Sequence, residues 1–291
     1  MSELVYINGK FVPREEARVS VDDHGFLYGY GLFETMRAYH GRIFRQDEHL
    51  ARLLRSTARV GLDLSGLDLA QACRETLSAN GLESARIRLT ISHGDSPDMP
   101  WHEPAGPPTV VITARAYQPL PPDAYRRGYR VVISSCRQFS RSSLRGVKPI
   151  SYLLNILARR EAASRGFDEA LLLNEDGCFT EGSTSNVFFV AGSDLVTPPL
   201  DSGILPGITR DLVIELAGAL DIPITEENVT PAGLSRFRQA FLTASTLEIM
   251  PLASVTPTDA AAPLFQSDGL GNIIPRLMNA YKEKVSEETS F

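Results

Sequence analysis

The chain of 291 residues contains little cysteine and no long apolar run. Its three cysteines, Cys73, Cys136 and Cys178, stand in unrelated contexts and lack the paired spacing of a zinc site or a disulfide framework. No uninterrupted apolar stretch reaches the ~20 residues that span a bilayer, and the N-terminus has no charged leader before an apolar run. The sequence therefore predicts a soluble, cytoplasmic protein with reduced thiols, most of which serve packing.

An excess of positive charge is also absent, because the formal net charge is −6. Nucleic acids and anionic membranes bind concentrated basic faces, so neither is an expected partner, and small molecules are. The five histidines include no pair at metal-ligand spacing, and no Gly-x-Ser-x-Gly elbow occurs. The run from Gly29 to Glu34 ends in glutamate where a dinucleotide loop has a third glycine. These absences argue against metal sites, serine hydrolases and Rossmann enzymes.

The first half of the chain predicts a small α/β unit that ends at a proline-rich run. Alternating apolar residues predict strands at 4–7, 10–12, 86–92 and 109–114. A helix is expected at 47–60, ended by Gly61, with one face formed by Leu50, Leu53 and Leu54. The run 118–123 holds three prolines and cannot continue a sheet ladder, so it is expected to be an interdomain linker.

The second half predicts a larger unit with more regular signals. We expect strands at 129–135, 169–173 and 186–190, a helix at 151–165 and a turn at Asp176-Gly177. A further helix after Gly207 should turn four residues inward, namely Leu212, Val213, Leu216 and Leu220. The polar tail 282–291 is expected to fray. The predicted division is a small N-terminal α/β domain at 1–117, a linker at 118–123 and a larger C-terminal domain at 124–291.

One lysine and one glutamate in the second half stand out. Lys148 precedes the helix predicted at 151–165, and Glu181 lies in a Gly/Ser-rich strand segment farther along the chain. An exposed ion pair between residues so distant contributes only about 0–1 kcal/mol, so stability does not explain them. Both segments indicate a functional site.

Several motifs in a consistent order resemble the class IV aminotransferase family. They are the runs 24–29 and 31–37 near the start, Lys148, the run from Glu181 to Asn186, and the turn from Leu205 to Arg210. The similarity extends from about residue 6 to about residue 251. It implies an α/β (α+β) protein with the two-domain D-amino acid aminotransferase-like fold, pyridoxal 5′-phosphate between its domains, and a homodimer, which is usual in the family.

The resemblance assigns Lys148 to the aldehyde of this cofactor and Glu181 to its pyridine ring. Lys148 would hold the pyridoxal aldehyde as a Schiff base and later move the proton of the substrate α-carbon. Glu181 would face the pyridine nitrogen and keep it protonated, so that the ring remains an electron sink. Gly182 would let the backbone pass close to the ring. Tyr152 matches a tyrosine that bonds the ring hydroxyl in some relatives, although a helix aromatic is equally natural in a core.

The resemblance also implies a phosphate site. A helix N-terminus offers unpaired N–H groups and a favourable dipole, and Ile208 and Thr209 would supply such amides, with the Thr209 hydroxyl as helix cap. Arg52 matches the phosphate-binding arginine of the family, and its alternative is a snorkelling arginine on a helix surface. Ala244 and Ser245 belong to a loop that matches a phosphate-binding or substrate-carboxylate loop.

Relatives of this family differ in substrate, and the residues at the positions that distinguish them do not all match one substrate class. D-amino acid enzymes carry Arg-x-His in the loop after the strand at 86–92, whereas this chain has Asp98 in place of the arginine. Branched-chain enzymes have Tyr-x-Arg on the strand, whereas here Arg86 replaces the tyrosine and Arg88 is retained. Family lyases carry threonine at the position of Thr35. The D-amino acid reading is weakened, and the lyase stays a serious alternative.

Four further residues are candidate substrate contacts. Arg37 and Arg88 can each grip a carboxylate with two hydrogen bonds, although a strand-surface charge is an equal reading of both. Tyr28 and Phe33 would form an apolar or aromatic wall, although sheet core is equally natural for them.

The predicted reaction exchanges an amino group between an amino acid or amine and a 2-oxo acid by a ping-pong mechanism. The first alternative is a 4-amino-4-deoxychorismate lyase that releases pyruvate and 4-aminobenzoate without a 2-oxo acid acceptor. The second is a non-catalytic protein that binds pyridoxal phosphate.

Overall fold

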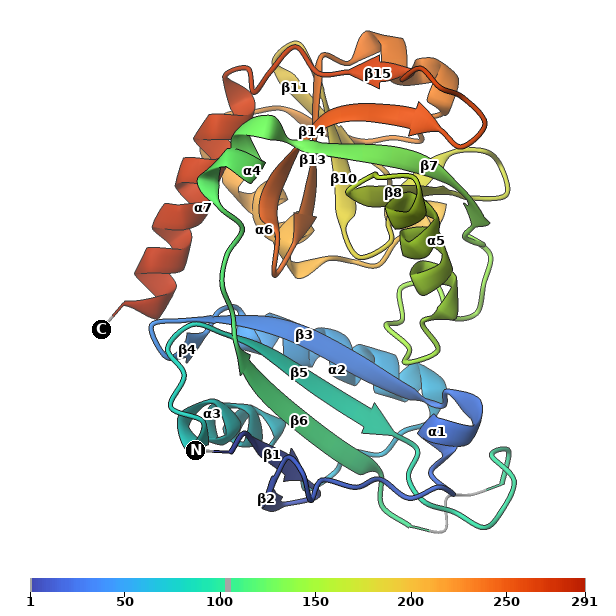
Figure 1. Cartoon of the computed structure of the whole chain (residues 1–291), viewed down its shortest axis with the longest axis vertical. Helices are drawn as coiled ribbons and strands as arrows, with labels where there is room; N and C mark the ends of the chain where they lie inside the picture. Colours follow the sequence, from blue (N-terminus) through green and yellow to red (C-terminus); the bar gives the residue numbers. More distant parts are fainter. Residues whose placement is uncertain (1, 103–105, 291) are drawn as a thin grey trace. The chain divides into compact units, whose positions relative to one another are not determined.

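A computed structural model describes residues 2–102 and 106–290 (Figure 1). The chain forms two compact units. The first comprises residues 1–118, 147–151 and 285–291, and the second comprises residues 119–146 and 152–284. The segment that carries Lys148 therefore packs with the first unit, although the chain reaches it after entering the second. The division into 1–117, 118–123 and 124–291 stays a prediction.

The first unit contains an antiparallel sheet with strand order β2-β1-β6-β5-β3-β4. Its strands are β1 (Leu4–Ile7), β2 (Lys10–Pro13), β3 (Gly31–Tyr39), β4 (Arg42–Ile43), β5 (Ala85–Ser92) and β6 (Thr109–Ala116). Its helices are α1 (His24–Tyr28), α2 (Gln46–Val60) and α3 (Leu69–Ala79). On β5, Ile87 and Leu89 are fully buried against α2 and α3, while Arg86 and Arg88 lie on the opposite, outer face.

Helix α2 confirms the predicted helix and its end at Gly61, but not the predicted face. Leu53 is buried, whereas Leu54 is 52% exposed. The buried face instead includes His49 and Arg52. Counting only apolar residues misplaced this face, because a buried acid on β3 pairs with both polar side chains.

The second unit contains a mixed sheet with strand order β12-β11-β10-β13-β14-β7-β8-β9, and β15 pairs with β14. Its strands are β7 (Tyr129–Arg137), β8 (Glu169–Leu173), β9 (Phe179–Gly182), β10 (Asn186–Ala191), β11 (Asp194–Thr197), β12 (Ile224–Glu226), β13 (Gln239–Ala244), β14 (Glu248–Pro257) and β15 (Phe265–Gln266). Its helices are α4 (Pro122–Arg127), α5 (Leu153–Ser164), α6 (Ile208–Ala219) and the 3₁₀ turns Leu200–Ser202 and Pro231–Arg236, together with the part of α7 (Ile273–Thr289) that precedes residue 285.

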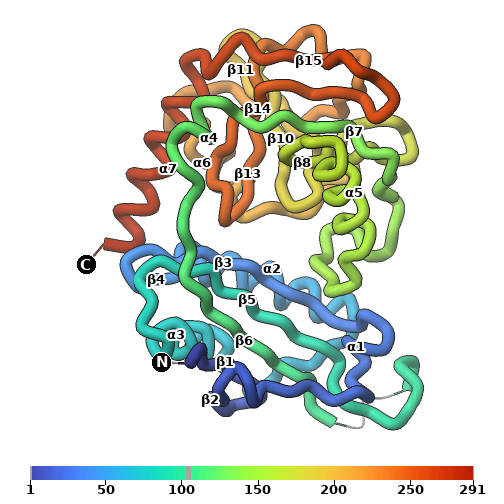
Figure 2. Tube along the Cα trace, in the orientation of Figure 1, coloured from blue at the N-terminus to red at the C-terminus, as the bar shows by residue number. Residues whose placement is uncertain are grey.

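Long-range pairing builds the centre of this second sheet. Figure 2 shows β7 beside β14, which is much later in the chain, and the two pair in parallel. The phenylalanines of the core stack on each other, with the rings of Phe188 and Phe241 4.9 Å apart. The predicted strands and helices of the second half are confirmed, except that Leu220 ends α6 and is only partly buried.

Pro122 and Asp123, expected in the linker, form the first turn of α4, because proline is preorganised for the start of a helix. The linker at 118–123 stays a prediction, whereas the expectation that the C-terminal tail frays was wrong. The tail expected to fray is helical through Thr289, while residue 291 lies outside the described residues. Tyr281, Val285 and Thr289 are buried at a spacing of four, which makes one helix face. Within the described part of the chain, no helix is long and apolar enough to cross a membrane.

Candidate active site

Lys148 is anchored to the sheet of the first unit by its own backbone. The N–H of Phe33 on β3 donates to the carbonyl of Lys148 at 3.0 Å, and the N–H of Ile150 donates to the carbonyl of Gly31 at 3.0 Å. The Nζ atom of Lys148 lies 4.7 Å from the centre of the Phe33 ring. The side chain is partly buried. The backbone of Lys148 is thus fixed to β3, and its amine lies against the Phe33 ring on the outer face of this strand.

A buried ion pair lies on the inner face of the same strand. The Nε and Nη2 atoms of Arg52 donate to the two carboxylate oxygens of Glu34 at 2.8 and 2.6 Å, and Nδ1 of His49 donates to the second of them at 2.8 Å. All three side chains are buried. Two parallel bonds of this kind fix the plane of a guanidinium. The reading of Arg52 as a surface arginine is therefore wrong, and Glu34 orients it.

The charges of this cluster follow from its surroundings. Burial raises the pKa of Glu34, but the charge of Arg52 and the hydrogen bond from His49 outweigh burial and lower that pKa to about 2. Burial lowers the pKa of His49 below its ordinary value, and the positive charges of Arg52 and Lys148 act in the same direction, against the opposing effect of Glu34. At neutral pH, Glu34 is ionised and His49 is a neutral hydrogen-bond donor.

Sequence reasoning did not assign a role to Glu34. The available signal was its position, since it replaces an apolar residue between Leu32 and Met36 on the inward face of a strand. An acid at such a position needs a buried partner.

The Glu34 pair makes a prediction about stability against pH. A carboxyl whose pKa falls from 4.5 to about 2 on folding stabilises the folded state above pH 4.5 and loses this contribution as the pH falls toward 2. The Glu34→Gln variant should therefore be less stable at neutral pH, by on the order of 3 kcal/mol in free energy of unfolding. Urea titrations should show the difference from wild type shrinking as the pH falls below 4.5.

The matched control for this series is Glu16→Gln, which removes an exposed carboxylate from the same unit. It should stay close to wild type at every pH. A Glu34→Gln deficit that is constant with pH would show that lost packing, not the carboxylate charge, accounts for it.

Three of the predicted substrate residues, Phe33, Arg37 and Arg88, lie on the outer face of the sheet around β3. The Phe33 ring contacts both Lys148 and Arg88, whose guanidinium carbon is 3.9 Å from the ring centre. Arg37 is 4% exposed, and its guanidinium stacks on Tyr117 at 3.8 Å. Tyr28 lies apart in α1, half-exposed, with its ring edge against His24. Lys148, Phe33 and Arg88 are therefore brought together, whereas no contact joins Tyr28 to them among the described interactions.

Glu181 lies in the second unit, at the end of β9, and is 8% exposed. One carboxylate oxygen accepts a bond from Nε2 of Gln138 at 3.1 Å. The other accepts bonds from Nδ2 of Asn186 at 3.2 Å and from the N–H of Leu205 at 3.0 Å. The reading of Glu181 as a solvated strand-end glutamate is wrong. Three donors orient its carboxylate, and sequence reasoning missed the roles of Gln138 and Asn186.

The residues after Glu181 make a rigid turn. A Cβ atom on Gly182 would collide with the hydroxyl of Ser185, so a larger residue would force Ser185 to move. The hydroxyl of Ser183 donates to the buried carboxylate of Glu169. The carbonyl of Ser183 accepts the hydroxyl of Tyr152 at 3.0 Å. The Tyr152 hydroxyl is thus held by this turn and has a polar partner.

Helix α6 begins next to the same cluster. Asn186 bonds the carbonyl of Leu205 at 2.9 Å, and a Cβ on Gly207 would collide with the Asn186 side-chain oxygen. Gly207 is the N-cap, and no side chain caps the helix. The expectation that Thr209 caps it was wrong, because Thr209 lies within the first turn and is buried. The first-turn amides of Ile208 and Thr209 have no intrahelical acceptor and are suited to an anion.

The loop with Ala244 and Ser245 follows β13, where the N–H of Leu247 donates to the carbonyl of Ala244 at 3.1 Å. Two buried hydroxyls of the second unit, those of Ser185 and Thr243, have no hydrogen-bond partner among the described residues. Thr243 is the register partner of Asn186 on β10. Buried polar groups without partners indicate a place where a ligand supplies them.

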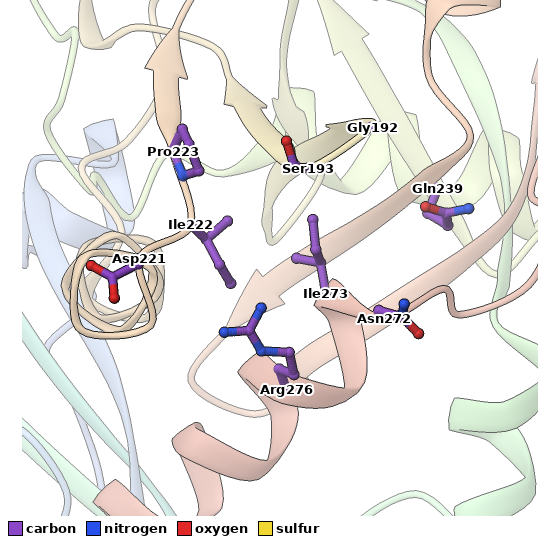
Figure 3. Close-up of a pocket in the computed structure, with 9 residues that line it drawn as sticks. All are labelled: Gly192, Ser193, Asp221, Ile222, Pro223, Gln239, Asn272, Ile273 and Arg276. Atoms are coloured by element: carbon purple, nitrogen blue, oxygen red, sulfur yellow. The ribbon is translucent and has the colours of Figure 1, made fainter.

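A separate pocket of about 440 Å³ opens elsewhere in the second unit (Figure 3). Asp221 and Arg276 contribute opposite charges to its lining, and the N-terminal residues of α7 form part of its wall. Arg276 also donates to the carbonyl of Leu220 at 2.9 Å. None of the predicted site residues lines this pocket.

Comparison with known proteins identifies the family. The family model described as amino-transferase class IV matches residues 31–255. The branched-chain-amino-acid aminotransferase of Escherichia coli is 34% identical over 266 residues, which are 87% of this chain and 85% of that protein. The chain belongs to the class IV aminotransferase family. The family, fold and cofactor predicted from the motifs are thereby confirmed.

Two further relatives of this class IV aminotransferase differ in their described activity. The aminodeoxychorismate lyase of Bacillus subtilis is 34% identical over 256 residues, 87% of this chain and 86% of that protein. The solved branched-chain aminotransferase of the archaeon Thermoproteus uzoniensis with norvaline has a TM-score of 0.87 and 32% identity, covering 100% of this chain and 97% of that one.

Class IV aminotransferases use pyridoxal 5′-phosphate, and the residues of this chain fit that group. The oriented carboxylate of Glu181 suits a basic ring nitrogen, since three N–H donors hold it in place. The uncapped start of α6 and the unpartnered hydroxyls of Ser185 and Thr243 suit a phosphate. The amine of Lys148 suits an aldehyde.

Proposed function

We propose that this class IV aminotransferase exchanges the amino group of an aliphatic L-amino acid with a 2-oxo acid, and that Lys148 and Glu181 act on one pyridoxal phosphate. The observation that carries the proposal is the position of Lys148, whose backbone is bonded to β3 and whose amine lies 4.7 Å from the centre of the Phe33 ring. The branched-chain relatives support an aliphatic substrate.

Pyridoxal phosphate, when bound, supplies an electron sink for the charge left on the substrate α-carbon. The Nζ atom of Lys148 accepts the α-proton and later returns a proton to the α-carbon of the second substrate. The oriented carboxylate of Glu181 would keep the ring nitrogen protonated. In the second unit, the amides of Ile208 and Thr209 would bind the phosphate. In the first unit, Glu34 holds Arg52 in one orientation, and Arg52 stays a predicted phosphate ligand. Phe33 packs against the amine of Lys148.

Two features support an L-amino acid over a D-amino acid. Asp98 occupies the position where D-amino acid enzymes carry arginine, and an acid repels an α-carboxylate. Its loop is held in place, since Nε2 of His24 donates to the Asp98 carbonyl at 3.0 Å and the Asp98 N–H donates to Ser96 at 3.2 Å.

A second candidate function is the lyase reaction on aminodeoxychorismate. Thr35, which resembles the lyase threonine, lies on the outer face of β3 directly opposite Arg88 of β5. The threonine hydroxyl and the guanidinium are suited to a substrate with more than one polar group. The Bacillus subtilis relative also supports this reading.

We also propose a homodimer in the cytoplasm. Four large apolar side chains on α5 are exposed, namely Leu153, Leu154, Ile156 and Leu157, and such a patch is typical of an interface. Cys73, Cys136 and Cys178 are all free thiols, which is typical of a reducing compartment.

The test of substrate class is a panel of amino donors, read by the spectrum of the bound cofactor in single half-reactions. L-leucine, L-valine and L-isoleucine should convert the cofactor with a kcat/KM at least ~10-fold above that for D-alanine. Pyruvate released from aminodeoxychorismate without a 2-oxo acid would favour the lyase. A spectrum unchanged by every donor would favour the non-catalytic alternative and overturn the proposal.

A further inference from the structure

We propose that the outer face of the first unit's sheet binds a multivalent oxyanion, a molecule with at least two carboxylate or phosphate groups, through Arg86 and Arg115. The site is distinct from the residues assigned to the cofactor. Its existence does not depend on the proposed reaction.

Three arginines stand opposite one another on three neighbouring strands. In the register of the sheet, Arg37 of β3 pairs with Arg86 of β5, and Arg86 pairs with Arg115 of β6. Partners in an antiparallel register project from the same face, and like charges placed this way destabilise a sheet. Arg86 is repelled by the like charges of both neighbouring arginines, which indicates that an anion binds here and offsets the repulsion.

The protein itself neutralises only part of this charge. Glu3 pairs with Arg115 at 3.3 Å and with Arg14 at 3.0 Å. Among the described residues, Arg37 and Arg86 have no ion-pair partner. Arg37 is also buried, and its Nε and Nη1 atoms have no hydrogen-bond partner in the part of the chain that the structure describes. Arg37 does not line the pocket described next, but its charge adds to that of Arg86 beside it.

A pocket of about 300 Å³ opens on this face. Its lining combines guanidinium and hydroxyl donors, from Arg14, Arg86, Arg88, Arg115, Thr90 and Thr113, and none of the acidic residues that the structure describes lines it. Several guanidiniums around a small volume are suited to a compact anion with several carboxylate or phosphate groups. A single carboxylate would leave most of these donors unpaired.

The pocket borders the proposed reaction site through Arg88, whose guanidinium contacts the Phe33 ring that Lys148 also contacts. The anion therefore has two possible sources with the same chemistry. It is either a second acidic group of the substrate itself or a separate molecule. These sources differ in how the anion affects the kinetics of the enzyme.

Titration calorimetry of the holoenzyme with citrate at low ionic strength tests the site. Citrate should bind, acetate should not, and added salt should weaken citrate binding. Arg86→Gln and Arg115→Gln should each weaken it about tenfold, because each removes a charge-assisted pair. Both side chains are exposed, so both variants should keep the wild-type fold by circular dichroism. Calorimetry does not require turnover, so citrate binding can be confirmed or refuted even if the protein does not catalyse the proposed reaction.

The matched control is Arg55→Gln, which removes an equal charge from an exposed position on α2. It should bind citrate like the wild type. Absence of citrate binding to the wild type, or equal weakening in all three variants, would overturn the proposal. Where binding is found, competition between citrate and the 2-oxo acid assigns the site to a second acidic group of the substrate. Inhibition that the 2-oxo acid does not relieve assigns it to a separate molecule.

Discussion

The Lys148→Ala variant is expected to lose about 10²–10⁴-fold in kcat, because no other group supplies the amine that moves the α-proton. Its backbone bonds to Phe33 and Gly31 use main-chain atoms, so the segment should stay in place without the side chain. The measurement is kcat for the best donor of the panel, with cofactor content determined in parallel. A loss of turnover in protein that still contains phosphate-bound cofactor would locate the defect in proton transfer.

Two variants serve as controls for this prediction. Lys148→Arg keeps a positive charge beside Phe33 but cannot condense with an aldehyde, so it should be as inactive as the alanine variant. Lys10→Ala removes an exposed lysine of β2 and should keep full activity. Activity of Lys148→Arg near the wild-type level would mean that the charge, not the amine chemistry, is what the site needs.

The Glu181→Gln variant should lower kcat by about 10²–10³-fold, the usual effect of removing one preorganised electrostatic group. Glutamine has the shape of glutamate but no charge to hold a proton on the ring nitrogen. Its amide would also place donor hydrogens against Nδ2 of Asn186 or the N–H of Leu205. Because the charge acts in the transition state, KM for the amino donor should change much less than kcat.

The control for this variant is Glu16→Gln, an exposed position in the first unit that should keep wild-type kinetics. Glu181→Asp keeps the charge on a shorter side chain and should be intermediate. A Glu181→Gln enzyme with wild-type kcat would show that this carboxylate does not serve the ring nitrogen.

The sequence was most informative where chemistry is local. Lys148 and Glu181 were identified by motifs, and the structure buries Glu181 as a functional residue requires, although their joint action stays a proposal. The strand pattern of β5 was predicted correctly, because alternation of charged and apolar residues reads directly as two faces.

The sequence was least informative where partners are distant. Glu34 and Arg52 form one buried unit from a strand and a helix, and neither local pattern shows the other. Gln138, which directly follows β7, donates to Glu181, and this contact was also missed because the two residues are distant in sequence. The tail at 282–291 was misjudged because it looks polar by itself, although it continues helix α7, whose apolar residues Ile274, Leu277 and Tyr281 are buried just before it. Such features depend on tertiary contacts that composition and periodicity do not encode.

The most direct test of the account is to reduce the holoenzyme with borohydride, digest it and locate the cofactor by peptide mass spectrometry. The chain has only four lysines, at positions 10, 148, 282 and 284, so the assignment is unambiguous. The account predicts that the cofactor is attached to Lys148 and to no other lysine. Attachment at Lys10, Lys282 or Lys284 in an active preparation would contradict it.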